Sequence, residues 1–191
     1  MKVLYSREDG QKFQHCKGVD IITKQFMIFA AKVSKIIESG DWEMLVTQYD
    51  DNSSYEFSLW CGKKVSMIRT INMHTGYYEH DTFTVDEKFR GMGITQLMLE
   101  ATVNICESLG VKKVITSAIL DGRIVWLKRG FIPFNLPKYF DDLKVAGLLV
   151  EEKDRTEYWF TKENVKKHER VLAEISWHGY AYVETLKEFV K

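Results

Sequence analysis

The chain has 191 residues, of which 45% are apolar, 13% aromatic and 28% charged. Lysine plus arginine and aspartate plus glutamate number 27 each, so the formal net charge is zero. This balance excludes a global electrostatic attraction to nucleic acid or to an anionic membrane surface. A chain of this length is expected to form a single domain.

The three cysteines, Cys16, Cys61 and Cys106, are widely spaced and form no CxxC pair. This pattern argues against a disulfide framework and for a reducing compartment. The five histidines include no i,i+4 pair on a plausible metal-binding helix, so no metal is expected. The N-terminus has no basic-then-apolar leader, and lysines interrupt the most apolar run, residues 21–37. We therefore expect a cytoplasmic protein with no membrane partner.

The first part of the chain reads as a short strand and two helices. Residues 3–5 are a strand candidate. From Asp20 to Ile37 apolar residues recur at helical spacing, and Gly40 follows as a stop signal. Asp41 is suited to cap a second, short helix.

Three strand patterns follow these helices. Residues 55–60 and 65–71 are joined by a hairpin at 61–64. A third strand covers about His80 to Val85. Together with a later strand at 111–119 they predict one sheet.

The most informative segment is the basic, glycine-bearing turn from Arg90 to Thr95, between a strand and a helix. Gly91 and Gly93 allow a sharp turn and a close approach of the backbone to a ligand. The free N–H groups at the start of the helix favour an anion, and the natural guest is a phosphate or pyrophosphate. Such a turn also occurs where nothing binds, so the segments that follow it matter.

After this helix come the strand at 111–119, a short helix at 123–129 and the pair Gly130-Phe131. The segment from Phe83 to Thr95 resembles the acetyl-CoA motif of the GNAT superfamily of N-acetyltransferases, written [Q/R]-x-x-G-x-[G/A]. Its three defined positions are occupied by Arg90, Gly93 and Thr95. The segment from Val125 to Phe131 resembles the family's later aromatic-to-Gly-Phe segment.

This resemblance covers about residues 55–135 and implies a fold. The fold would be α/β (α+β), with a central mixed, mostly antiparallel sheet splayed between its fourth and fifth strands. Helices would flank the sheet, and an extra helix would follow at the C-terminus. The single GNAT-like domain, 1–191, would have its core at about 20–161 and a helical extension at about 162–191.

The resemblance also implies acetyl-CoA as cosubstrate. Backbone groups of residues 83–85 would pair with the pantetheine arm, and residues 90–95 would hold the pyrophosphate. The implied binding residues are Phe83, Thr84, Val85, Arg90, Gly91, Met92, Gly93, Ile94, Thr95 and Trp126.

Two residues depart from the family pattern. Thr95 replaces the motif's final Gly or Ala, and its branched side chain crowds the pyrophosphate position, although its hydroxyl could donate to a phosphate oxygen. Trp126 lies where many members carry a tyrosine that protonates the departing CoA thiolate. An indole N–H cannot deliver a proton in that way.

Glu79 and His80 are the candidates for the general base. Glu79 is at about the position where some protein-lysine acetyltransferases of the superfamily place a glutamate base. His80 is the competitor, because an imidazole titrates near neutral pH. Both residues could instead be structural. The candidates for the missing acid are Tyr77, Tyr78 and Tyr139.

Three functions are open at this point. The first is a cytoplasmic N-acetyltransferase whose amine acceptor attacks acetyl-CoA directly in a ternary complex. The second is a GNAT-fold protein that has lost catalysis and acts as a structural or interaction module. The third is an unrelated α/β phosphate-binding protein, although no GxxxxGK[ST] sequence supports a nucleoside triphosphate site. Small molecules, peptides and RNA-linked amino groups are all open as acceptors.

The last third of the chain departs most from the family core. Residues 137–153 predict a helix, which would be either a lid over the acceptor pocket or a surface helix at the sheet edge. Residues 156–161 predict the last strand. A long helix follows, whose apolar stripe would pack on its own domain or form a subunit interface of a homodimer.

Overall fold

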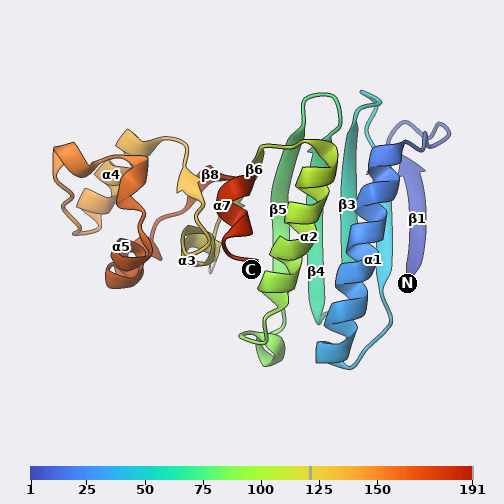
Figure 1. The fold of residues 1–191 in the computed structure, drawn as a ribbon, viewed down its shortest axis with the longest axis horizontal. Helices are drawn as coiled ribbons and strands as arrows, with labels where there is room; N and C mark the ends of the chain where they lie inside the picture. Colours follow the sequence, from blue (N-terminus) through green and yellow to red (C-terminus); the bar gives the residue numbers. More distant parts are fainter. Residues whose placement is uncertain (121, 191) are drawn as a thin grey trace.

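The computed structural model describes residues 1–120 and 122–190. Its centre is an eight-stranded sheet in the order β1-β2-β3-β4-β5-β6-β8-β7 (Figure 1). The strands are β1 Lys2–Arg7, β2 Glu43–Gln48, β3 Ser54–Cys61, β4 Val65–Asn72, β5 Tyr77–Val85, β6 Lys113–Ala118, β7 Ile132–Pro133 and β8 Trp177–Tyr182. The hairpin predicted at 61–64 is confirmed, because it joins β3 to β4.

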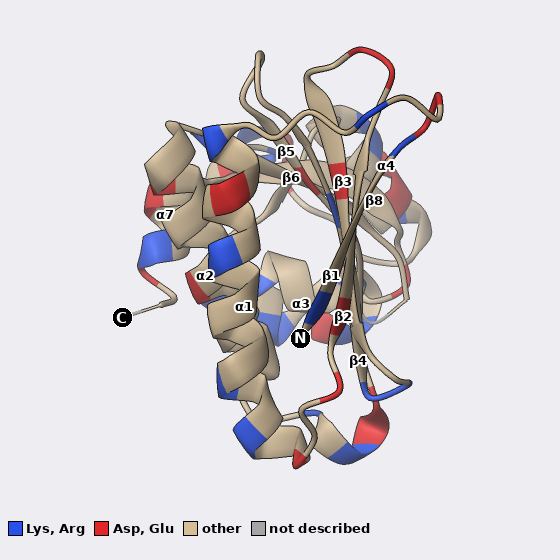
Figure 2. Ribbon diagram, turned by 90° about the vertical axis from the view of Figure 1, so that its right-hand side faces the viewer, with Lys and Arg blue, Asp and Glu red and all other residues tan. Residues whose placement is uncertain are grey.

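Helices α1 and α2 lie side by side over one face of strands β1 to β5 (Figures 1 and 2). Among the described residues, no helix combines the length and the apolar character that a membrane crossing requires. The helices are α1 Lys17–Ile37, α2 Ile94–Leu109, α3 Gly122–Leu127, α4 Leu136–Val145, α5 Lys162–Lys167, α6 Glu169–Leu172 and α7 Val183–Lys187, with 3₁₀ turns at Glu87–Phe89, Glu152–Asp154 and Glu157–Trp159.

The sheet is mostly antiparallel, and it parts in one place. β2 to β5 pair antiparallel, and β1 lies parallel to β2 at the edge. β5 and β6 pair in parallel only where Tyr78–His80 faces Val114–Thr116. Among the described strands, residues 82–85 of β5 then have a neighbour in β4 alone. The α/β fold and the splayed sheet are therefore confirmed. The strand β2, in a segment predicted to be a helix, adds one strand ahead of the parting, which therefore lies between the fifth and sixth strands.

The helix predicted from Asp20 to Ile37 is confirmed as α1 and begins at Lys17. Its buried residues follow the helical period and face the sheet. It ends where Glu38 turns into the left-handed region with φ of 51° and donates its N–H to the carbonyl of Ser34.

A strand, β2, replaces the helix predicted from Asp41. Met44, Val46 and Gln48 are buried on alternate positions, which is the period of a strand. β2 lies between β1 and β3 and pairs with both. The secondary structure of this segment is determined by the strands that pair with it on each side. The intrinsic propensity of six residues is a weak effect compared with this tertiary context.

The predicted long helix over 162–191 is wrong. Short helices α5 and α6 lead into β8, which inserts between β6 and β7 and is followed by α7. Residues 156–161, predicted to be the last strand, form the 3₁₀ turn Glu157–Trp159 instead, and the last strand is β8. The predicted C-terminal helix is present only as α7, whose Lys187 pairs with Glu107 of α2 at 2.7 Å.

The segment 137–153 is helical only over α4 and the turn Glu152–Asp154. Tyr139 and Phe140 are 3% and 1% exposed, and Phe140 packs against Trp159. These side chains therefore belong to the core of this region. The lid interpretation stays a prediction. α4 and α5 lie beyond β7 and β8, at the end of the molecule opposite β1 (Figure 1), which fits the alternative of a surface helix.

Gly179 of β8 allows β7 to approach closely. A Cβ atom there would lie 2.1 Å from the carbonyl oxygen of Ile132, a backbone atom that cannot rotate away. Gly179→Ala is therefore expected to lower the free energy of unfolding by about 2 kcal/mol or more, measured by urea denaturation. Gly40→Ala is the control, because a Cβ at Gly40 meets nothing within 4 Å. Equal losses in the two variants would contradict the prediction.

Candidate functional site

The end of β5 leads into the turn that is predicted to bind an anion. After Val85, the side chain of Asp86 accepts the N–H of Lys88 and starts the 3₁₀ turn Glu87–Phe89. Arg90 then folds back, and its Nε donates to the carbonyl of Val85 at 3.2 Å. The first bond closes the 3₁₀ turn, and the second attaches the turn to the end of β5.

Two glycines shape the turn where α2 begins. Gly91 and Gly93 have φ of +77° and +82°, a region that favours glycine, and Gly93 caps α2. The N–H groups of residues 96 and 97 bond to the carbonyl of Gly93, whereas within the described chain those of residues 94 and 95 meet no acceptor. The first turn of α2 carries no acidic side chain. Free N–H groups and the positive end of the helix dipole together suit a phosphate group.

The strand edge beside this turn is open on the β6 side. Residues 83–85, predicted to pair with a pantetheine arm, lie on it. The register of β4 and β5 shifts between Ile68 and Arg69, which leaves Asp81 without a partner in β4. Such a bulge redirects backbone groups, and an open edge accepts an extended ligand as an additional strand.

The two base candidates point to opposite faces of the sheet, because adjacent strand residues alternate. His80 is 2% exposed on the side of α2, and its Nε2 lies 3.2 Å from the hydroxyl of Thr102. Burial, together with the charge of Arg69, lowers the pKa of His80 well below its usual value. The imidazole is therefore neutral at pH 7, and the two candidates cannot act on the same proton.

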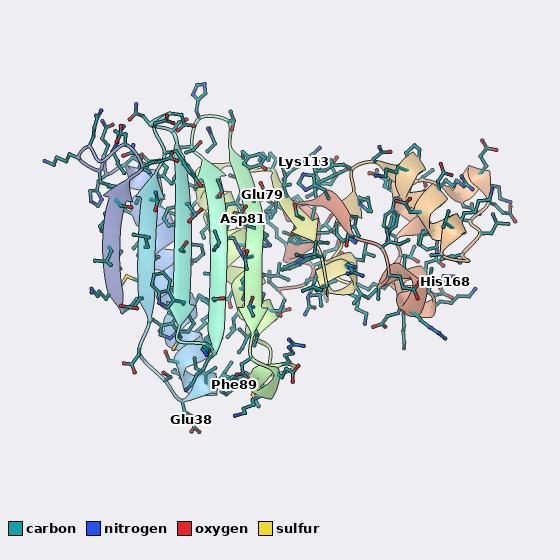
Figure 3. The ribbon with its side chains drawn as sticks, turned by 180° about the vertical axis from the view of Figure 1, so that it is seen from behind. Glu38, Glu79, Asp81, Phe89, Lys113 and His168 are labelled. Carbon is teal, nitrogen blue, oxygen red and sulfur yellow. The ribbon has the colours of Figure 1, made fainter. Side chains whose placement is uncertain are left out.

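Glu79 lies on the face turned away from α1 and α2 (Figure 3). The hydroxyl of Tyr77 donates to its carboxylate, and burial together with this bond raises the pKa of Tyr77. Across the sheet Glu79 is in register with Thr70, and Thr70 with Glu56.

Asp81 extends this row of side chains on the same strand (Figure 3). Burial raises the pKa of Asp81, and the nearby charges of Glu79 and Glu56 raise it further. Sequence reasoning missed Asp81 and Glu56. From sequence, the alternation of β3 predicts only that Glu56 and Ser58 share a face of the sheet. That Glu56 is a neighbour of Glu79 follows from the strand register.

Trp126 of α3 is 6% exposed and packs its ring 5.2 Å from His80 and 5.3 Å from Phe131, measured between ring centroids. It therefore lies beside the parting of β5 and β6. Of the three candidate acids, Tyr78 is buried and Tyr139 belongs to α4, so Tyr77 alone shares a face with Glu79.

A separate cleft of about 570 Å³ lies in the C-terminal part, between residues 148–159 and 164–168. It contains none of the residues predicted for CoA or catalysis. Among the described residues, no group of three His, Cys, Asp or Glu side chains could hold a metal ion.

No protein-family model matches the chain, and no curated protein matches it. Among solved structures, a crystal structure of nourseothricin acetyltransferase is similar with a TM-score of 0.38 and 11% sequence identity. The similarity covers 70% of this chain and 68% of that one.

Proposed function

We propose that this protein is an N-acyltransferase, which moves an acyl group, acetyl in the simplest case, from CoA to an amine. The observation that carries the proposal is the continuity between the anion-binding turn of α2 and the open edge of β5. The turn at 90–95 would hold the pyrophosphate. The pantetheine amides would pair with residues 83–85, which brings the thioester to the bulge at Asp81.

The reaction is direct attack in a ternary complex. The ammonium form of the amine gives one proton to Glu79, and the neutral nitrogen attacks the thioester carbonyl carbon. The C–S bond breaks, CoA leaves as a thiolate, and the nitrogen gives its second proton to solvent, which leaves a neutral amide. The bond from Tyr77 orients the Glu79 carboxylate. Because thiols ionise near pH ~8.5, the thiolate leaves without a strong acid, and Trp126 at the parting is compatible with turnover.

A second candidate is a CoA-binding protein without catalysis. The observation that favours it is the position of Trp126, whose indole beside the parting of β5 and β6 can donate no proton to a sulfur atom. Binding would then serve stability or interaction rather than turnover.

The test separates binding from turnover. Calorimetry with CoA, acetyl-CoA and ATP is expected to show dissociation constants on the order of micromolar for both CoA compounds and none measurable for ATP. Release of free thiol is then followed with amines, peptides and aminoacyl conjugates, with hydrolysis subtracted. Binding without acceptor-dependent release selects the second candidate. Absence of CoA binding overturns both, and tight binding of ATP alone indicates an unrelated phosphate-binding protein.

A further inference from the structure

A buried arginine without an acidic partner lies beside the proposed site. Arg69 of β4 is 1% exposed and occupies an inward-facing position of the strand, on the side of α2. In the part of the chain that the structure describes, no carboxylate forms an ion pair with it. Burying a charge without a partner is costly, so this residue needs another explanation than stability.

The contacts of Arg69 leave one edge of its guanidinium unused. Nη1 donates to the carbonyls of Ile68 and Thr82, while Nε and Nη2 are buried without a partner. Nε and Nη2 share one edge of the planar group and present two parallel N–H bonds. That edge is the one that binds a carboxylate with two hydrogen bonds.

The environment of the guanidinium also suits an anion. Burial lowers the pKa of Arg69 to about 10, so the group is still charged at pH 7. The hydroxyl of Tyr78 and Nδ1 of His80 are buried on the same face, and neither has a partner at hydrogen-bond geometry in the described chain. The Tyr78 hydroxyl and the charge of Asp81 lie near enough to Arg69 to raise its pKa, but these effects are smaller than the lowering by burial. A buried cation with unpaired polar groups beside it is expected to bind an anionic ligand, because each buried unpaired group costs free energy.

The position of Arg69 connects it to the open edge of β5. Its Nη1 is bonded to Thr82, the first residue that pairs with β4 beyond the bulge. The ring of Phe83 lies over the guanidinium with a centroid 5.8 Å from Cζ, and Phe83 is only partly buried. A thioester paired with β5 would therefore bring its acyl chain to this point, and a swing of the Phe83 ring would open the way to the guanidinium.

We propose that Arg69 binds a carboxylate at the far end of the acyl chain. The preferred donor is then a CoA thioester of a short dicarboxylic acid, such as malonyl-CoA or succinyl-CoA, rather than acetyl-CoA. This inference rests on the proposed acyl-CoA function and adds the class of acyl group.

Calorimetry with four CoA esters tests the inference. Succinyl-CoA is compared with butyryl-CoA, which has the same chain length without the carboxylate, and malonyl-CoA is compared with acetyl-CoA. Wild-type protein is expected to bind one of the two charged esters at least about tenfold more tightly than its uncharged counterpart. In Arg69→Met the preference should reverse, because the carboxylate would be buried without a partner.

Arg123→Met is the matched control. Arg123 also donates from Nη1 to a backbone carbonyl, that of Ala173, and also has an unpaired Nε, but it lies on α3. The preference for charged esters should persist in this variant. If Arg69→Met does not fold, the wild-type affinities alone show whether the protein prefers a charged acyl chain to an uncharged one.

Equal affinity of wild-type protein for all four esters would overturn the role of Arg69 while leaving the proposed function intact. If neither CoA nor any ester binds, the proposed function fails, and the inference fails with it.

Discussion

Replacing Gly93 by aspartate is expected to abolish CoA binding in a protein that still folds. The substitution puts a carboxylate at the start of α2, where the free N–H groups of residues 94 and 95 would meet the pyrophosphate. Like-charge repulsion and lost space act together, so the affinity should fall by at least about a hundredfold. Calorimetry with CoA measures the loss, and circular dichroism checks the fold.

Gly93→Asn is the matched control for this experiment. Asparagine has nearly the size of aspartate, and both residues tolerate the φ of +82° better than other side chains do. A steric clash does not distinguish the aspartate variant from the asparagine variant, since a Cβ atom at Gly93 meets nothing within 4 Å. The asparagine variant should retain measurable binding. Unchanged binding in folded Gly93→Asp would show that the pyrophosphate lies elsewhere.

Glu79→Gln is expected to lower kcat by about a hundredfold while leaving CoA affinity nearly unchanged, the range typical of a lost base. The amide keeps the shape of the side chain and can still accept the bond from Tyr77, but it cannot take a proton from the amine. Acceptor-dependent thiol release gives kcat, and calorimetry gives the CoA affinity.

Two neighbouring carboxylates serve as comparisons. Glu56→Gln changes the same row of side chains on β3, where Glu56 accepts from the hydroxyl of Tyr49 at 3.2 Å, and should cost much less in kcat. Asp81→Asn tests the rival base at the bulge. Full activity of Glu79→Gln with a large loss in Asp81→Asn would move the base to Asp81.

The sequence predicted secondary structure correctly where the pattern within a single segment is sufficient to determine it. The helical period from Asp20 to Ile37 and the short hairpin at 61–64 both predicted the right elements. It failed for β2 and β8, each of which pairs with a strand far away in the chain, β1 for β2 and β6 for β8. Gly179 lies in the segment predicted as one long helix, whereas in the structure it belongs to β8 and admits the backbone of β7.

In the candidate site, too, local features were predicted from the sequence, and features that depend on the packing of the sheet were not. The sequence identified the turn at 90–95, because two glycines between a strand and a helix constrain the local backbone. It also named Glu79 and His80, but it could not separate them. Their assignment to opposite faces follows from the alternation of β5 once the sheet is built.

By itself the sequence determined a zero net charge, an amphipathic first helix and a glycine turn with free N–H groups at its helix end. These features depend on composition and on dihedral preferences of neighbouring residues. Only the tertiary structure decided where β5 and β6 part, which carboxylates gather around Glu79, and that Arg69 is buried without an acidic partner in the described chain. Each of these depends on strand register, which brings together residues distant in the chain and cannot be derived from any one segment.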